Sequence, residues 1–303
     1  MRQIGVVIAA LAFAAAAQGA AAQEAAAQEA AAQGAAQGWT LEQAAVVEGF
    51  LVPECLCPDP ESGAVYVSNV EAAEDEYWND DGKGFVSRMT ATGEIEALRW
   101  LDTDPLAVLN GPKGLCILKG NLYIADNGRL LRCPIKEKGP VAEVPLPRTG
   151  KLNDLATDGE FLYVSDTELG LVYKVGPTGS QTIIQAPPSV NGVTCFRGRL
   201  FAVGWDTHEV YELDPSGDNP PVPFGVAEHF TNLDGIEVLA DGTFIVSDFM
   251  GNQVCSIAPD RKTVQVLVQL ESPADIGIDR TRGLLYVPQF MLNKAVIYKL
   301  LRP

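Results

Sequence analysis

The chain repeats one pattern six times at intervals of about forty residues, and this repeat constrains the fold more than any other feature. Each copy contains a short turn, a polar residue, an apolar strand, a turn with Gly or Asp, and a second strand rich in aromatic and β-branched residues. The copies begin at Val52, Gly111, Lys151, Ser189, Asn232 and Ser272. Repeats of this length, without helical patterns between them, are typical of four-stranded propeller blades. We therefore predict an all-β, six-bladed β-propeller.

The sixth copy ends at Pro303 after only about three strands, so the last blade needs a strand from elsewhere. We expect residues 39–48, which precede the first copy, to supply this outer strand and close the ring. The predicted propeller then spans residues 39–303. A β-sandwich and a solenoid are the competing architectures.

One polar position recurs at the start of the first strand of each copy, and we call it the ring position. It holds Glu54, Lys113, Asn153, Asn191 and Asp234, with either Ala274 or Asp275 in the sixth copy. The innermost strands of a propeller line its central channel, so equivalent positions converge on the axis. Charged side chains gathered there lose hydration and repel one another unless something neutralises them.

Four of these side chains are oxygen donors, namely Glu54, Asn153, Asn191 and Asp234, and we call them the oxygen ring. Two carboxylates balance one divalent cation, and two amide oxygens add ligands without added charge. The set predicts a metal-binding funnel that holds one divalent cation. Ca²⁺ suits these donors best, Mg²⁺ or Mn²⁺ fits them as well, and Zn²⁺ is less natural without nitrogen or sulfur ligands. The alternative is that Asn191-Gly192 and Asp234-Gly235 are turn dipeptides, chosen for backbone geometry.

Other polar features have two interpretations each. Lys113, at the ring position of the second copy, either holds an anionic or carbonyl-bearing ligand or pairs with a neighbouring carboxylate. The acidic insertion at residues 70–85 does not fit the helix-loop-helix calcium pattern and is expected to be a loop at the mouth of the funnel. The recurrent Asp126, Asp166 and Asp248, which close the second strands, are expected to bind turn backbone groups.

The N-terminal segment predicts export. Residues 1–22 combine a basic start at Arg2, a short apolar run and small residues, as a secretory signal peptide does, and residues 23–38 form an Ala/Gln-rich low-complexity tether. We expect a periplasmic or secreted protein without a membrane span after cleavage. Its six cysteines allow 15 disulfide pairings, among which the sequence does not choose. The net charge of −17 argues against nucleic acid as a partner.

From about Glu48 to Pro303 the chain resembles the SMP-30/gluconolactonase/LRE-like family of propeller hydrolases, and within it an exported bacterial subgroup. Four sequences carry the resemblance, with a family ligand in each: VPEC, LNDL, VNGV and LDGI, which contain Glu54, Asn153, Asn191 and Asp234. The resemblance implies a six-bladed propeller with one catalytic divalent metal. It implies that Glu54, Asn191 and Asp234 are core ligands, that Asn153 is a ligand or a substrate contact, and that Asp234 is the base.

The implied activity is metal-dependent hydrolysis of lactones or related esters, with a small-molecule substrate in the central funnel. Glu54 and Asp234 are the catalytic candidates, and Lys151, Lys113 and Asn153 are the substrate-binding candidates. Lys151 stands where sugar-lactone hydrolases often have Arg, so a sugar substrate is not implied. One alternative is a non-enzymatic periplasmic propeller with a structural metal, which binds a small ligand or a protein. A metal-free condensing enzyme like strictosidine synthase is a third reading.

Overall fold

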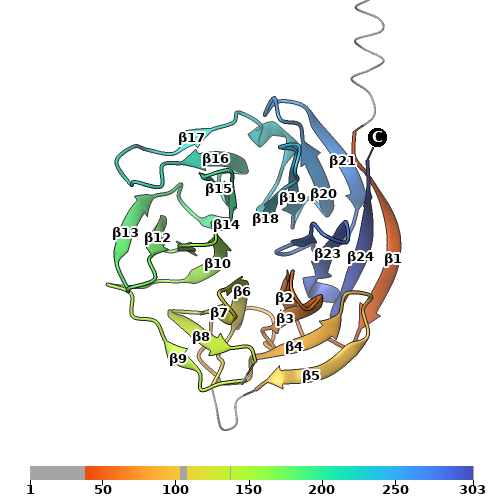
Figure 1. Ribbon diagram of the computed structural model, residues 1–303. Helices are drawn as coiled ribbons and strands as arrows, with labels where there is room; N and C mark the ends of the chain where they lie inside the picture. The colour runs from red at the N-terminus through yellow and green to blue at the C-terminus, as the bar shows by residue number, and fades with distance from the viewer. Residues whose placement is uncertain (1–37, 103–107, 137, 303) are drawn as a thin grey trace, which may run out of the picture. The chain divides into compact units, whose positions relative to one another are not determined.

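The computed structural model describes residues 38–102, 108–136 and 138–302, and in it the repeat forms six four-stranded antiparallel sheets around a central axis (Figure 1). The predicted six-bladed propeller is therefore confirmed. The expected signal peptide, and the expected tether apart from Gly38, lie outside the described residues.

The first three blades follow the chain order from the innermost strand outward. Blade 1 contains β2 (Pro53–Pro58), β3 (Ala64–Asn69), β4 (Phe85–Thr90) and β5 (Ile95–Leu101). Blade 2 contains β6 (Pro112–Leu118), β7 (Asn121–Asp126), β8 (Arg129–Pro134) and β9 (Ala142–Glu143). Blade 3 contains β10 (Leu152–Thr157), β11 (Leu162–Asp166), β12 (Leu171–Val175) and β13 (Gln181–Gln185).

The next two blades repeat this order, and the last one differs from it. Blade 4 contains β14 (Val190–Phe196), β15 (Arg199–Gly204), β16 (Glu209–Leu213) and β17 (Val222–Pro223). Blade 5 contains β18 (Leu233–Val238), β19 (Phe244–Asp248), β20 (Gln253–Ile257) and β21 (Val264–Gln269). Blade 6 contains β22 (Gly277–Asp279), β23 (Leu284–Gln289), β24 (Lys294–Leu301) and β1 (Thr40–Glu48).

Strand β1 completes blade 6 by pairing with β24, so the N-terminal strand joins the C-terminal one (Figure 1). This confirms the predicted closure, with β1 beginning at Thr40. Residues Leu41–Leu301 form one compact unit. No helix in the described part of the chain is long and apolar enough to cross a membrane.

Adjacent blades pack face to face, and this explains the sequence pattern of the second strands. Every residue of β3 and β11 is buried, because these strands lie between two other sheets. Tyr66 on blade 1, for example, belongs to the same apolar cluster as Leu122 and Ile124 on blade 2. Outer strands such as β13 are mostly exposed, since they lie at the rim.

Candidate functional site

Each of the first five blades has a β-bulge in its innermost strand, and the bulge contains the ring position. In blade 1, Pro53 pairs with Asn69 and Leu56 pairs with Val67, so Glu54 and Cys55 together face one residue of β3. In blades 2 to 5 the same bulge follows Pro112, Leu152, Val190 and Leu233. A bulge bends the strand and redirects its side chains, and it commonly lies next to a functional site.

A serine on the neighbouring strand stabilises the bulge in three blades. Ser68 Oγ accepts a hydrogen bond of 2.9 Å from Cys55 N, Ser165 Oγ one of 2.8 Å from Asp154 N, and Ser247 Oγ one of 2.7 Å from Gly235 N. These serines were not among the predicted site residues. Their signal in the sequence is the recurrent YVSN, YVSD and IVSD at the end of the second strand.

Glycine follows the ring position in three blades because the next blade approaches closely. A Cβ on Gly192 would lie 2.4 Å from the carbonyl oxygen of Asp234, and a Cβ on Gly235 would lie 2.6 Å from Ile276 N. Asn191-Gly192 and Asp234-Gly235 lie within β14 and β18. The turn-dipeptide alternative is therefore wrong, since the glycines here allow blade-to-blade contact and do not form turns.

The sixth blade contributes Ala274 to the ring position. The backbone N–H of Asp275 donates a 2.9 Å hydrogen bond to the carbonyl oxygen of Glu54, and Asp275 forms a parallel bridge with Cys55. Asp275 is thus equivalent to Cys55, one residue beyond the ring position. Of the two candidates in the sixth copy, neither adds an oxygen ligand at the ring position itself.

The oxygen ring is buried, and each of its four members has an unpaired oxygen. Glu54, Asn153, Asn191 and Asp234 are each only 5–6 % exposed. Glu54 Oε2, Asn153 Oδ1, Asn191 Oδ1 and Asp234 Oδ1 accept no hydrogen bond. Buried polar atoms without partners are rare, because each one loses its hydration without compensation. Four such oxygens on equivalent bulges fit the ligand set of a hard divalent cation.

The two carboxyls of the oxygen ring are held in an environment that disfavours their charge. Burial, followed by the charge of Asp234, raises the pKa of Glu54 well above its usual value. Burial, followed by the charge of Asp154, raises the pKa of Asp234 to about 8. The described residues contain no cluster of three or more His, Cys, Asp or Glu arranged for a metal ion. The fit to a cation therefore depends on the two amide oxygens as much as on the carboxylates.

Lys113 shares the ring position but points toward the insertion at residues 70–85, which we call the lid. Its ammonium donates to the carbonyl oxygen of Tyr77 at 2.7 Å, to that of Gly111 at 2.9 Å, and to Asn127 Oδ1 at 3.4 Å. It makes no direct contact with Glu54, although its charge acts to lower the pKa of the Glu54 carboxyl. Burial lowers the pKa of Lys113 to about 8.

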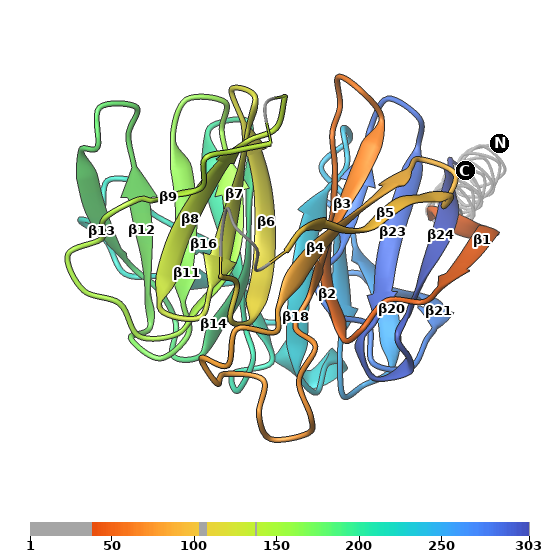
Figure 2. The ribbon, with the colours of Figure 1, turned by 90° about the horizontal axis from the view of Figure 1, so that it is seen from below.

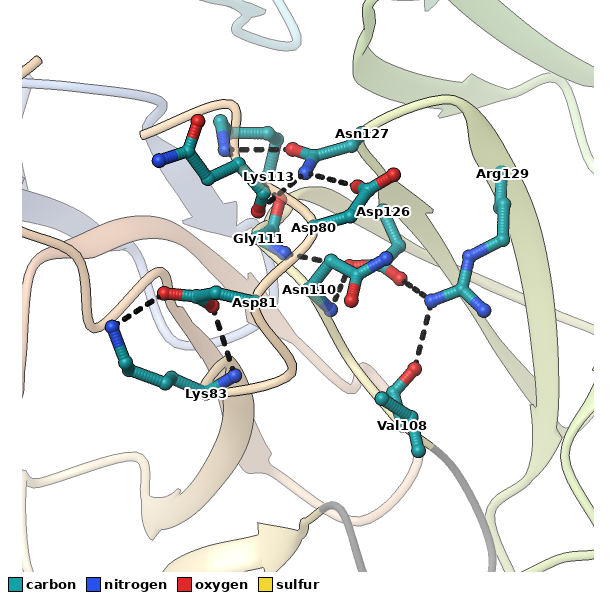
Figure 3. Close-up of polar contacts among 11 residues, drawn as sticks. Asp80, Asp81, Lys83, Val108, Asn110, Gly111, Lys113, Asp126, Asn127 and Arg129 are labelled. Atoms are coloured by element: carbon teal, nitrogen blue, oxygen red, sulfur yellow. Dashed lines mark hydrogen bonds and ion pairs between the residues drawn. The ribbon is translucent and has the colours of Figure 1, made fainter. Parts of the chain in front are cut away.

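Asn127 fixes the lid from the turn between β7 and β8. Its side-chain amide donates to the carbonyl oxygen of Asn79 at 3.1 Å and to Asp80 Oδ1 at 2.9 Å (Figure 3). Two lysine ammonium groups lie near the indole of Trp78: Lys113 Nζ is 4.5 Å from the ring centroid, and Nζ of the exposed Lys151 is 5.3 Å from it. Figure 2 shows the lid extending from β3 and β4 at one end of the ring. The insertion is therefore a loop attached to blade 2 at the oxygen-ring end of the funnel, as the sequence suggested for its location.

Replacing Asn127 by Gly is expected to loosen the lid without distorting the turn. Asn127 has a φ of 52°, which Gly tolerates well, so the variant removes mainly the amide contacts to the lid. We expect amide hydrogen exchange of residues 71–84 to accelerate by about tenfold, since each lost hydrogen bond is worth about 1 kcal/mol.

The control is Asn252→Gly, at the equivalent turn of blade 5, where φ is 52° and Asn252 Oδ1 accepts from Ser272 N. This variant is expected to leave exchange in the lid unchanged. Equal exchange of residues 71–84 in wild type and Asn127→Gly would mean that Asn127 does not hold the lid.

The aspartates that close the second strands bind backbone groups, as predicted. Asp126 accepts hydrogen bonds from Asn110 N and Gly111 N, and Asp166 accepts from Gly150 N and Lys151 N. Asp248 accepts from Thr231 N and Asn232 N. These contacts fix the turns that lead into the innermost strands, and so position the oxygen ring.

A cavity of about 350 Å³ lies on the other side of the bulges. It is lined by the residues after the ring position, including Cys55, Asp154 and Asp275, and by Cys57, Cys116 and Cys195 further along the strands. None of the oxygen-ring residues lines it. All six cysteines are free, and burial raises the pKa of each thiol. The oxygen ring thus separates the funnel mouth from this lower cavity.

Solved structures match this architecture over most of the chain. A structure provisionally described as that of a gluconolactonase has a TM-score of 0.64 and 20% identity over 87% of this chain and 92% of its own. The luciferin-regenerating enzyme has a TM-score of 0.63 and 13% identity over 87% of this chain and 95% of its own. The chain has the fold of the SMP-30/gluconolactonase/LRE-like propellers.

The same fold extends to a structure described as streptogramin B lyase, with a TM-score of 0.62 and 14% identity over 87% of this chain and 98% of its own. No family model and no curated protein matches the chain. At these identities the comparisons establish the six-bladed propeller fold that the chain shares with these enzymes, and they do not establish its chemistry.

Proposed function

We propose that the protein is a metal-dependent hydrolase of lactones or related esters. The observation that supports this most is the set of four unpaired oxygens on the buried oxygen ring. Glu54, Asn153, Asn191 and Asp234 would hold one divalent cation, with Ca²⁺ favoured and Mg²⁺, Mn²⁺ or Zn²⁺ as other occupants. A cation bound there supplies charge stabilisation for the carbonyl oxygen of an ester and makes a nearby water more acidic.

The residues of the chain then have separate roles in the reaction. Asp234 accepts the proton of the water that attacks the carbonyl carbon, and returns it to the leaving-group oxygen of the lactone or ester when the C–O bond breaks. Glu54 would hold the cation beside it and balance its charge. Asn153 and Asn191 would contribute amide oxygens to the cation without adding negative charge, and Asn153 is also proposed to contact the substrate. Lys151, exposed beside Trp78, is proposed to contact the substrate outside the oxygen ring.

Lys113 can contact a substrate only when the lid moves away from it. In the structure, the three N–H groups of the Lys113 ammonium are all donated to acceptors of the protein, so none is left for a ligand. Opening would release the contact to Tyr77 and make Lys113 available to an anionic or carbonyl-bearing substrate. We also propose that the protein acts in the periplasm or outside the cell, on the basis of residues 1–22.

Lyase chemistry is less well supported by this site. One solved structure is of a catalytically inactive virginiamycin B lyase from Staphylococcus aureus in which a histidine is replaced by alanine. The histidines of the present chain are His208, in the turn after β15, and His229, on the 3₁₀ helix Ala227–His229. Neither lies on the innermost strands that carry the oxygen ring, although His208 lies in the lid-side turn beside Trp205 and its Nδ1 has no hydrogen-bond partner.

The proposed function is tested by metal analysis of the purified protein, followed by assays on a panel of γ- and δ-lactones and aryl esters. We expect about one equivalent of divalent cation, loss of hydrolysis with a chelator, and recovery when Ca²⁺ is restored. Protein without bound cation, and without a thermal shift on adding one, would refute the metal site. Tight cation binding with no turnover of any lactone or ester would favour the non-enzymatic propeller.

A further inference from the structure

The mouth of the funnel carries aromatic side chains from three blades and from the lid. Tyr77 of the lid contacts Phe290 edge to face at a centroid distance of 4.9 Å. Phe290 contacts Phe249 at 5.6 Å, and Phe249 contacts Trp205 at 5.4 Å. These residues lie in the turns of blades 4, 5 and 6 on the same side as the lid. They form an apolar arc around one part of the mouth.

This arc reaches the oxygen ring itself. Ala274, the ring-position residue of blade 6, belongs to the same apolar cluster as Phe249 and Phe290. The carbonyl of Glu54, its neighbour in blade 1, accepts a hydrogen bond from the residue after Ala274. On the other side of blade 1, Trp78 contacts Lys113, the ring-position residue of blade 2. Apolar surface therefore adjoins the oxygen ring on two sides.

Many of the polar side chains at the same end are already used within the protein, whereas Thr207 Oγ1 and His208 Nδ1, in the turn beside Trp205, have no hydrogen-bond partner. Asp126, Asp166 and Asp248 bind backbone N–H groups, and Asn252 accepts from Ser272 N. Asn127 holds the lid. A polyhydroxylated ligand needs a partner for each buried hydroxyl, and an unpaired one costs about 1–3 kcal/mol. Besides Thr207, His208 and the exposed Lys151, the mouth offers few such partners, and Tyr77, Trp78 and Trp205 give it partly exposed aromatic surface.

We propose that the substrate carries an apolar chain or ring beside its carbonyl group, and that Trp78 is the residue that selects for it. This inference rests on the proposed function, because the carbonyl is placed at the oxygen ring. The apolar substituent packs against the indole of Trp78 and the partly exposed rings of Tyr77 and Trp205, which the buried Phe290 and Phe249 support from behind. The preferred class is an alkyl- or aryl-substituted lactone or ester, and an aldonolactone is a poor substrate.

The kinetic test compares γ-butyrolactone, γ-lactones with longer alkyl chains, and glucono-1,5-lactone. We expect kcat/KM of wild type to rise by about fourfold per added methylene until the site is filled, since burial of one methylene is worth about 0.8 kcal/mol. Trp78→Ala is expected to lose roughly tenfold on γ-decalactone and to change γ-butyrolactone by less than about threefold. Trp78→Phe should retain most of the preference for the long chain.

The control is Phe161→Ala. Phe161 also lies under a lysine, 4.3 Å from Lys174 Nζ, but in the turn between β10 and β11 at the other end of the blades. It is expected to leave the chain-length profile unchanged. Hydrolysis of glucono-1,5-lactone as efficient as that of γ-decalactone would overturn the inference while the proposed hydrolase function stands.

A binding measurement tests the inference without catalysis. Calorimetry with the Ca²⁺-loaded protein and a δ-lactam, which resists hydrolysis, is run with and without a hexyl substituent. We expect the hexyl compound to bind at least tenfold more tightly to wild type, and this gain to be lost in Trp78→Ala. Equal affinities of the two lactams for wild type would overturn the inference even if no lactone were turned over.

Discussion

Replacing Asp234 by Asn is expected to abolish tight cation binding while making the cation-free protein more stable. The substitution removes one of two carboxylates from the oxygen ring, and we expect cation affinity to fall by on the order of 100-fold or more. At a Ca²⁺ concentration of 100 times its Kd, wild type gains about 2.7 kcal/mol from binding. For a protein of this size that corresponds to a rise in Tm of roughly 5–10 °C. Adding Ca²⁺ should raise the Tm of the variant hardly at all.

Without the cation, Asp234→Asn is expected to stabilise the protein, because the buried carboxylate of wild type then lacks its counter-charge. Burial and the charge of Asp154 raise the folded-state pKa of Asp234 to about 8, whereas its ordinary value is 3.8. Its contribution to the stability of the cation-free protein is therefore greatest below pH 4 and is lost as the pH rises toward 8. Asn does not titrate, so in chelator the variant should melt above wild type at pH 8.5.

Asp218→Asn is the matched control, since it removes the same charge from an exposed loop position. It should behave like wild type in both calcium and chelator. A thermal shift with calcium that is as large in Asp234→Asn as in wild type would remove Asp234 from the ligand set. The measurements are melting curves with Ca²⁺ and with chelator at pH 5 and pH 8.5.

Replacing Gly192 by Ala should disrupt the ring between blades 4 and 5. The new Cβ would lie 2.4 Å from the Asp234 carbonyl oxygen and 3.0 Å from the Gly235 Cα, and neither backbone atom can move without shifting β18. Overpacking of this kind costs about 1–3 kcal/mol or more. We also expect cation affinity to fall at least about tenfold, because the displaced bulges carry Asn191 and Asp234.

The control for this variant is Gly128→Ala. Its Cβ would meet only Gly150 O at 3.5 Å and Thr149 Oγ1 at 3.7 Å, which are ordinary contacts, so a change below about 0.5 kcal/mol is expected. Chemical denaturation and calcium titration of both variants test the prediction. A Gly192→Ala protein with wild-type stability and wild-type calcium affinity would mean that the blades tolerate a wider spacing at the ring.

The repeat allowed the blades to be predicted because their first two strands are buried on both faces. Strands such as β3 and β11 consist mainly of apolar, β-branched and aromatic residues, and this pattern recurs in every copy of the repeat. The outer strands carry little of this signal. Strands β9 and β17 are two residues long and exposed, so their positions follow from pairing with the third strand of each blade.

The candidate site could be predicted only in part for a similar reason. The ring position was visible because polar side chains recur at equivalent places in five of the six copies. The choice between Ala274 and Asp275 depends on the hydrogen bond from Asp275 N to the Glu54 carbonyl, which joins residues far apart in the sequence. The role of Lys113 depends on the backbone carbonyl of Tyr77, and any residue type supplies a carbonyl.

The pairing of β1 with β24 has a consequence for how the protein is made. A ribosome delivers residues 40–48 first and residues 294–301 last, so the first strand synthesised waits for the final one before blade 6 can form. Contacts of such large sequence separation slow folding, and a chain that is still growing keeps unpaired edges exposed. Circular permutants with new termini in the turn between two other blades would move this seam, and refolding rates would report where the ring closes.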